Sequence, residues 1–474
     1  MVFSSIPFLY YFLPMVLLAY FITPQKGRNA VLLIASLLFY AWGEPVYVLL
    51  MLFSILIGYL AGILLEKSML GNYKFLTPKA VLSGSVFVFA GIFIYFKYTD
   101  FFISNFNAVT GLSVPLLHIL LPVGISFYTF QIISYLVDVY RKEVPAQKNF
   151  ISLAAYVAMF PQLIAGPIVR YASVAEQLEK RTCTFIMAES GIYRFVIGLA
   201  KKVLLANELG ALCEGFRASG DKSVLYYWLY AVAFCLHIYF DFSGYSDMAI
   251  GLGRILGFSL PENFNYPYIS ASITEFWRRW HMSLGSWFRD YLYIPLGGNR
   301  VPKVKWYRNI FIVWLFTGLW HGASWNFVIW GLYFGILLVI EKKWLLRILE
   351  KAKGVRNCYV LLLLLIGFVM FNASDMSQAM SDIRCLFGMG GIPAVSAEAL
   401  YYLKSYGVTI LVSVIASTPA MALLATGIQQ KVNAYPVTSI VWQVTKVMAA
   451  LALLLLSTAY LVDGSFNPFL YFRF

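Results

Sequence analysis

His321 is the residue of this sequence best placed for chemistry. It stands in the polar, glycine-containing stretch Thr317 to Asn326, inside residues 309–340, which carry no formal charge. A neutral imidazole can take a proton from an attacking hydroxyl and return it to a leaving thiolate near neutral pH. An ionisable side chain at membrane depth is costly and is usually functional. The alternative is a structural histidine bonded between helices, but Gly322 beside it would let other groups approach the ring closely, which favours a catalytic role.

The charges around this segment predict how the chain positions His321. Cations precede the segment and follow it, at Arg300, Lys303, Lys305 and Arg308 and at Lys342, Lys343 and Arg347. Both ends therefore read as cytoplasmic. The uncharged stretch is longer than the roughly 20 residues of one crossing and shorter than the roughly 40 of two. We expect a hairpin that turns inside the membrane at Thr317 to Asn326.

A second cluster of chemical interest runs from Glu275 to Asp290. Tryptophan and leucine side chains recur there at helical spacing, at Trp277, Trp280, Leu284 and Trp287, and arginines interleave with them. This pattern predicts a continuous interfacial helix with aromatic rings at headgroup depth. Arg278 and Arg279 then either anchor the helix to lipid or bind the phosphates of a cytosolic donor such as coenzyme A.

The sequence has four histidines, so each carries information. His281 would lie in the middle of the interfacial helix, in a site role or a structural one. His118 lies in an expected loop and reads as structural. Asp241 and Asp247 are carboxylates in an apolar region, where such groups usually have partners. His237, four residues before Asp241 on a helix, could pair with it.

Composition indicates a membrane protein. Hydrophobic residues make up 61% of the 474 residues and charged residues 12%, too few to cover a water-soluble globule. We expect an all-α, multi-pass protein with roughly 11 to 13 membrane segments, some re-entrant or interfacial, forming one domain over residues 1–474. The run Ile6 to Ile22 precedes cations and predicts a retained anchor with its N-terminus outside. The net charge is +14, and the cationic residues lie in short loops, where they orient the helices and bind anionic lipid headgroups. No nucleic-acid partner is therefore expected.

Other features narrow the chemistry. The five cysteines are scattered without metal-type spacing, and no nucleophile elbow, Walker loop or zinc motif is present, so no metal is expected. Pro161, Gly166 and Pro167 interrupt the apolar run Ile151 to Val169. A broken helix at membrane depth must be buried in protein or line a wet cavity, so Phe160-Pro161-Gln162 is a candidate cavity lining.

Four motifs together resemble the membrane-bound O-acyltransferase (MBOAT) superfamily, in its bacterial alginate and polysaccharide O-acetylation branch. They are Trp320-His321-Gly322-Ala323-Ser324-Trp325, Glu275-Phe276-Trp277-Arg278-Arg279-Trp280-His281, Tyr239 to Asp247, and Phe160-Pro161-Gln162. The resemblance spans about residues 100–345, and the terminal Asn467 to Phe474 also resembles that branch. Residues 374–400 have no counterpart in it, which leaves partner docking open.

The resemblance implies a ring of membrane helices around a thin centre, with a cytosolic funnel that leads an acyl donor to His321. His281 matches the second histidine of the branch. The implied reaction moves an acetyl group from a cytosolic thioester, acetyl-CoA or another, across a bacterial inner membrane. A separate extracytoplasmic protein, acetyl-accepting or esterase-like, would receive the acetyl group and pass it to a polysaccharide, the final acceptor. The resemblance implies no bound cofactor. With His321 and His281 catalytic, the expected substrate-binding residues are Arg278, Arg279, Trp277, Trp320, Ser324, Asn326 and Asp241.

Two alternatives remain open at this stage. Transfer of D-alanyl groups from a carrier protein onto teichoic acid would use the same core chemistry with another donor. A transporter or flippase would also have broken helices and buried carboxylates such as Asp241 and Asp247. Transporters tend to have paired broken segments in two related halves, and the sequence shows no such symmetry.

Overall fold

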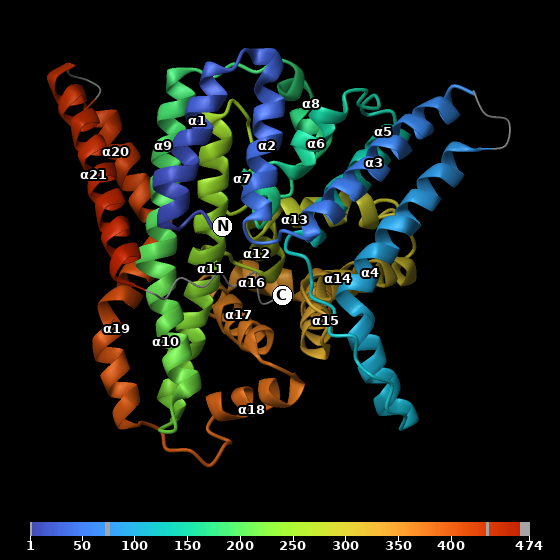
Figure 1. Cartoon of the computed structure of the whole chain (residues 1–474). Coiled ribbons are helices and arrows are strands. Elements are labelled where there is room, and N and C mark those ends of the chain that lie inside the picture. Colours follow the sequence, from blue (N-terminus) through green and yellow to red (C-terminus); the bar gives the residue numbers. More distant parts are fainter. Residues whose placement is uncertain (1, 72–75, 433–435, 465–474) are drawn as a thin grey trace. The chain divides into compact units, whose positions relative to one another are not determined.

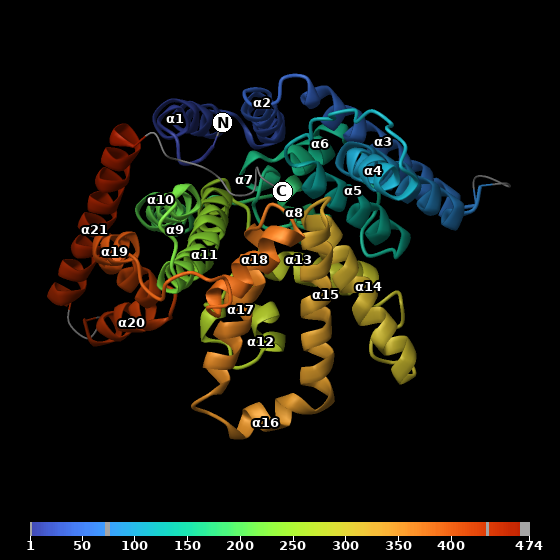
Figure 2. The same ribbon diagram turned by 90° about the horizontal axis from the view of Figure 1, so that it is seen from below.

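The computed structural model describes residues 2–71, 76–432 and 436–464. Helices connected by turns and loops make up these ranges, and no strand occurs within them (Figures 1 and 2). The prediction of an all-α protein is therefore confirmed. The terminal motif 467–474 lies outside the described residues.

The described chain forms two compact units, and the first comprises residues 1–192, 249–261 and 289–291. The helices that lie wholly within it are η1 (Phe8–Phe12), α1 (Leu13–Ile22), η2 (Gln25–Gly27), α2 (Arg28–Ala41), α3 (Tyr47–Met69), α4 (Pro78–Thr110), α5 (Ile125–Tyr140), α6 (Phe150–Ala158), α7 (Phe160–Leu163) and α8 (Tyr171–Glu179). The rings of Phe12 and Phe39 pack against Phe160 at centroid distances of 5.6 and 5.7 Å. An aromatic core thus joins the N-terminal helices to α7.

The break between α6 and α7 lies in the interior of this unit. α6 ends at Ala158, and all three residues of Phe160-Pro161-Gln162 are buried. Ser36 Oγ accepts a hydrogen bond from the backbone N–H of Phe160 at 3.0 Å, and Gln162 Nε2 donates to the carbonyl oxygen of Tyr156. Side chains thus satisfy backbone groups that the break releases. The predicted broken helix buried in protein is confirmed, and a cavity-lining role stays a prediction.

The second unit comprises residues 193–248, 262–288 and 292–474. Its helices include all or part of α9 (Phe185–Ala200), η3 (Lys201–Ala206), α10 (Asn207–Ala218), α11 (Val224–Ile255), η4 (Pro267–Ile269), α12 (Ile273–Arg279), α13 (Met282–Phe288), η5 (Arg289–Tyr293), α14 (Lys303–His321), α15 (Trp325–Ile340), η6 (Glu341–Leu345), α16 (Leu346–Lys351), α17 (Arg356–Asn372), α18 (Met376–Leu386), α19 (Ala397–Ala416), α20 (Ala420–Val432) and α21 (Pro436–Asp463).

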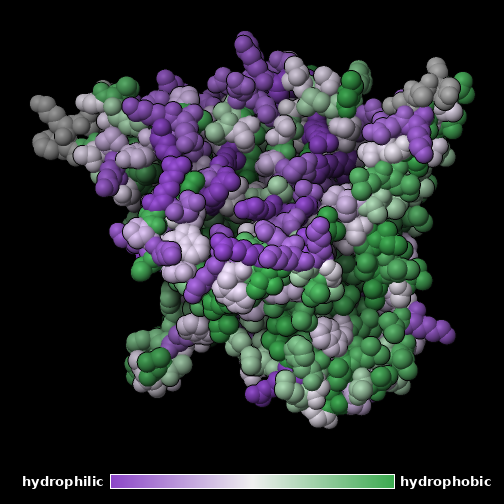
Figure 3. All heavy atoms as spheres, turned by 180° about the vertical axis from the view of Figure 1, so that it is seen from behind, coloured by the Kyte–Doolittle hydropathy of each residue, from purple (hydrophilic) through white to green (hydrophobic). Residues whose placement is uncertain are grey.

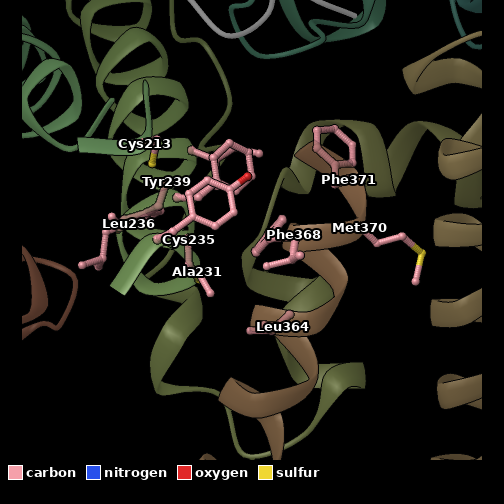
Figure 4. Packing of buried hydrophobic residues seen from close by; sticks show 14 of the residues in the cluster. Cys213, Ala231, Cys235, Leu236, Tyr239, Leu364, Phe368, Met370 and Phe371 are labelled. Carbon is pink, nitrogen blue, oxygen red and sulfur yellow. The ribbon is translucent and has the colours of Figure 1, made fainter. Parts of the chain in front are cut away.

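The core of the second unit lies between α11 and α17. Figure 4 shows Tyr239 of α11 and Phe368 of α17 within one cluster of buried hydrophobic residues. Cys213 and Cys235 are buried in the same cluster as free thiols. These cysteines serve as small apolar residues, as the sequence predicts.

Five helical segments in the described part are long and apolar enough to cross a membrane: Tyr47–Met69, Pro78–Thr110, Val224–Ile255, Ala397–Ala416 and Val437–Asp463. Hydrophobic side chains also cover broad areas of the surface in Figure 3. On α19 and α21 they include Val408, Leu411 and Val441, all more than half exposed. Such a surface needs lipid as solvent, so the chain is a multi-pass membrane protein. The predicted number of roughly 11 to 13 membrane segments includes shorter and re-entrant ones. That number and the orientation of the chain stay predictions.

Candidate active site

The segment that carries His321 folds as a helical hairpin. α14 ends at His321, α15 begins at Trp325, and the two helices lie side by side (Figures 1 and 2). Two glycines permit this approach: a Cβ on Gly318 would come within 2.4 Å of the carbonyl oxygen of Phe327, and one on Gly331 within 2.3 Å of that of Trp314. Small residues of this kind let membrane helices pack closely. The predicted hairpin and the place of its turn within Thr317 to Asn326 are confirmed, and the depth of that turn in the membrane stays a prediction.

Aromatic rings surround the half-buried side chain of His321. Its ring centroid lies 5.0 Å from that of Trp320, 5.1 Å from Trp330 on α15 and 5.3 Å from Phe371 on α17. All three contacts are edge-to-face, the arrangement that aromatic quadrupoles prefer. The packing fixes the plane of the imidazole, as proton transfer to a bound reactant requires.

The predicted continuous helix over Glu275 to Asp290 is wrong, because the chain breaks at His281. α12 ends at Arg279 and α13 begins at Met282, with His281 between them at φ 45°. The loop residue Asn263 accounts for the break. Its backbone carbonyl accepts a hydrogen bond from the N–H of Met282 at 2.9 Å, and its side-chain Oδ1 accepts one from the N–H of Ser283 at 3.2 Å. These amides at the start of α13 bond outside the helix, whereas a continuous helix would use them within itself.

The aromatic residues of this segment lie in the protein core, so they do not form the lipid-facing band that an interfacial helix would present, and their depth in the membrane stays a prediction. Trp280 and Trp287 are buried. The ring of Trp277 lies 4.8 Å from Trp314 on α14 and 4.9 Å from Phe334 on α15. Helical spacing of aromatic residues therefore reports burial here, because a buried face and an interfacial face have the same period.

His281 is buried at the break and contacts the same tryptophan as His321. Only 2% of its surface is exposed, and burial lowers the pKa of His281 to about 3, so the imidazole is neutral at physiological pH. Its Nδ1 lies 3.1 Å from Asn263 Oδ1. Its ring centroid lies 4.6 Å from that of Phe242 on α11 and 6.0 Å from that of Trp320. The structure thus brings the two predicted site histidines to one indole.

Comparison with known proteins assigns the chain to a family. Residues 140–371 match the family model "MBOAT, membrane-bound O-acyltransferase family". The chain is 40% identical to Probable alginate O-acetylase AlgI of Pseudomonas putida, covering 100% of both chains. It belongs to the membrane-bound O-acyltransferase family. This membership confirms the predicted O-acyltransferase and disfavours the transporter alternative.

Two further relatives show how far the similarity reaches. Peptidoglycan O-acetyltransferase of Helicobacter pylori is 32% identical, with 100% of this chain and 98% of that protein covered. Teichoic acid D-alanyltransferase of Bacillus subtilis is 31% identical, with only 45% of this chain and 57% of that protein covered. This acyltransferase is therefore similar to the O-acetylating relatives along its whole length and to the D-alanylating one along less than half of it.

Asn263 is a residue of this acyltransferase that the motif analysis missed. Its side chain is 1% exposed and donates from Nδ2 to Ser246 Oγ on α11 at 3.0 Å. The available signal was slight: polar residues at Glu262, Asn263 and Asn265 lie between apolar segments, shortly before the motif that ends at His281. Only the fold reveals that Asn263 returns to contact that motif.

The two predicted donor-binding arginines have different surroundings. Arg279 donates from Nε to Glu275 Oε1 at 2.9 Å and from Nη1 to the carbonyl oxygen of Asn265 at 3.1 Å. Arg278 is exposed. Burial, followed by the positive charge of Arg278, lowers the pKa of Lys342 at the end of the hairpin. Arg278 and Lys342 therefore act electrostatically on one another, and of the two arginines Arg278 presents more of its surface to a donor.

Asp241 forms a buried ion pair. Its Oδ1 lies 2.6 Å from Nζ of Lys202, and both side chains are at most 3% exposed. Asp247 bonds Lys201 at 2.7 Å and Arg194 at 2.8 Å. The positive charges of these partners offset the free-energy cost of burying carboxylates among the helices. The predicted role of Asp241 in substrate binding stays a prediction.

The remaining candidates lie at or near the turn of the hairpin. Trp320 is 2% exposed, between the two histidines. Ser324 precedes α15 and is half-buried. Asn326 is 1% exposed and donates from Nδ2 to the carbonyl oxygen of Ala373 at 2.9 Å, while its buried Oδ1 accepts no hydrogen bond from the described residues. Their substrate contacts stay predictions.

Proposed function

We propose that this acyltransferase moves an acetyl group from a cytosolic thioester, acetyl-CoA or another, across the membrane for O-acetylation of an extracytoplasmic polysaccharide. The names of the full-length relatives support the reaction, since one is an alginate O-acetylase and another a peptidoglycan O-acetyltransferase. The observation that carries the proposal is the position of His321 at the turn of a hairpin whose ends are both basic. A hairpin with both ends cytoplasmic would bring this imidazole to the depth where a donor from one side can meet an acceptor from the other.

His321 is the general base and acid in this proposal. Its unprotonated nitrogen takes the proton of an acceptor hydroxyl while the hydroxyl oxygen attacks the thioester carbonyl carbon. The tetrahedral intermediate collapses with cleavage of the carbon–sulfur bond, and the imidazolium returns the proton to the thiolate. The products are an O-acetyl ester and a free thiol, and the histidine ends as it began. In this proposal the aromatic rings around His321 would limit access of water, which could otherwise hydrolyse the thioester.

The donor and the partner follow from the same proposal. Arg278, with Lys342 near it, would attract the phosphates of coenzyme A at the cytosolic end. Arg279, Trp277, Trp320, Ser324 and Asn326 would shape the remainder of the substrate site. The acetyl group would pass to a separate extracytoplasmic acetyl-accepting or esterase-like protein, in a bacterial inner membrane. Transfer of D-alanyl groups is less well supported, because the D-alanylating relative covers less than half of this chain.

The experiment compares His321→Ala with His118→Asn in a host that lacks its own copy. His118 lies on an exposed loop at φ 49°, a conformation that asparagine tolerates, so its variant is a matched control for losing a histidine. We expect His321→Ala to remain in the membrane at normal amount and to lose polymer-bound acetyl groups, and the control to keep them. Normal acetylation by His321→Ala would refute the catalytic role. Mass spectrometry that found D-alanyl esters on the polymer would refute the acetyl donor.

A further inference from the structure

The side-chain amide of Asn263 can be oriented in only one way. The backbone N–H of Ser283, which can only donate, lies 3.2 Å from one corner of the amide. That corner must therefore be the oxygen, since the amide nitrogen would place two donors against each other. The amide nitrogen then donates to Ser246 Oγ at 3.0 Å.

This orientation determines the tautomer of His281. Nδ1 of the imidazole lies 3.1 Å from the same Asn263 oxygen, which also accepts from Ser283 Oγ at 2.9 Å. An amide oxygen has no proton to give, so Nδ1 carries the imidazole proton. A neutral imidazole has one such proton, and Nε2 therefore presents a lone pair. Nε2 is buried and has no hydrogen-bond partner among the described residues.

The backbone at His281 also depends on Asn263. A residue other than glycine at a φ of 45° costs about 1 to 2 kcal/mol and persists only where its surroundings impose it. The Asn263 carbonyl oxygen holds the next residue, Met282, through its N–H at 2.9 Å. One asparagine thus fixes both the backbone turn and the ring nitrogen of His281, and Ser246 of α11 holds that asparagine.

We propose that Asn263 is a positioning residue of the acyltransferase site, which holds His281 in the tautomer whose Nε2 accepts a hydrogen bond from a substrate hydroxyl or thiol. The inference rests on the proposed function in one respect, that His281 belongs to the site of acyl transfer. It assigns His281 a specific ligand group. A lone pair on Nε2 attracts the O–H of an acceptor or the S–H of the released thiol and repels the carbonyl oxygen of a thioester. His281 therefore orients the hydroxyl or thiol, and the thioester carbonyl lies elsewhere.

The first test is spectroscopic and uses the purified full-length protein with 15N-labelled histidine, at pH 8. The signals missing from His281→Asn identify those of His281. We expect a protonated Nδ1 and an unprotonated Nε2 in the wild type and in Asn263→Asp, whose carboxylate oxygen can accept the same bond. Asn263→Leu should give a mixture of tautomers or the opposite one. A wild-type signal with Nε2 protonated would overturn the proposal.

The second test is kinetic and uses acetyl-CoA as donor. Asn263→Leu should lower kcat at least tenfold while the KM for acetyl-CoA changes less than twofold, and Asn263→Asp should retain at least a third of the wild-type kcat. Ser246→Ala removes the partner of the amide nitrogen and leaves the oxygen in place, so we expect it to resemble Asn263→Asp. Wild-type kcat in Asn263→Leu would overturn the proposal, as would equal losses in the Leu and Asp variants. The spectrum needs no substrate, so it decides the tautomer even if acetyl-CoA fails as donor, and that failure would exclude only acetyl-CoA as the thioester of the proposed function.

Discussion

The ring of Trp320 lies 6.0 Å from that of His281, and it is also in contact with His321, the next residue, at 5.0 Å. One indole therefore supports both of the histidines predicted to belong to the acyltransferase site. Trp320→Ala should leave a cavity that costs about 3 to 5 kcal/mol and lets both imidazoles move. We expect more than a tenfold loss of acetyl transfer, measured per amount of protein in the membrane.

Trp320→Phe is the matched control because it keeps an aromatic ring and loses only part of the volume. We expect it to keep a third or more of the wild-type activity. Equal activity of the Ala variant and the wild type would show that the indole does not support the histidines.

Variants of the Lys202–Asp241 ion pair can distinguish a structural role of Asp241 from a role in substrate binding. Removing one partner leaves an unpaired buried charge, so Lys202→Met or Asp241→Leu alone should destabilise the protein by about 3 to 5 kcal/mol. The double variant should recover most of that loss, since no charge is left unpaired. Thermal unfolding in detergent measures this cycle.

Activity of the same three variants tests the predicted substrate contact of Asp241. If the double variant regains stability and acetyl transfer together, Asp241 acts only through the ion pair. If stability returns without activity, the carboxylate contacts substrate as the sequence analysis expected.

The hairpin of α14 and α15 was predictable because charge and length act on the whole segment. A stretch without charge, too long for one crossing and too short for two, has few arrangements in lipid, and the turn falls where glycine and polar residues occur. The Phe160-Pro161-Gln162 break was predictable for a similar reason. Proline removes a backbone donor wherever the helix lies.

The break at His281 was not predictable, because its cause lies 18 residues away in sequence. Nothing local in Trp280-His281-Met282 stops a helix, and the hydrogen bonds that stop it come from Asn263. The ion pair of Asp241 with Lys202 was missed for the same reason. Local spacing suggested His237, and the ion pair reaches back to Lys202 in a helix that comes earlier in the chain.

The glycines of the hairpin give a steric prediction. A Cβ at Gly331 would approach the carbonyl oxygen of Trp314 to 2.3 Å, and a backbone atom cannot yield as a side chain can. Gly331→Ala should therefore push α14 and α15 apart, lower the unfolding temperature and reduce acetyl transfer at least tenfold. Gly84→Ala on α4 is the control, because a Cβ there meets nothing within 4 Å. The same unfolding temperature in both variants would contradict this packing.

His281 predicts how stability depends on pH. Burial lowers its pKa to about 3 in the folded protein, against 6.5 when it is exposed. Between these values the unfolded chain binds more protons than the folded one. The contribution of neutral His281 is therefore complete above pH 6.5 and declines as the pH falls toward 3, by about 2 kcal/mol at pH 5. The unfolding temperature of His281→Asn in detergent should fall less than that of the wild type between pH 7.5 and 5. Parallel curves for the two proteins would count against this assignment.

The contrast between Arg278 and Arg279 predicts which arginine binds the donor. Arg278 is exposed, so Arg278→Gln should change stability by less than about 0.5 kcal/mol. It should raise the KM for acetyl-CoA by about three- to tenfold and leave kcat unchanged, because it removes attraction for the donor phosphates. This difference in KM between the variant and the wild type should be smaller at high salt, because salt screens the charge of Arg278 in the wild type.

Arg279→Gln should show the reverse pattern. It loses hydrogen bonds to Glu275 and to the Asn265 carbonyl, so we expect about 1 kcal/mol of destabilisation and a smaller change in KM. Both predictions, for Arg278→Gln and for Arg279→Gln, are checked by measuring the KM for acetyl-CoA and the unfolding temperature of each variant at low and high salt. A larger KM effect for Arg279→Gln than for Arg278→Gln would mean that the donor displaces Glu275 on binding, and would transfer the anchoring role to Arg279.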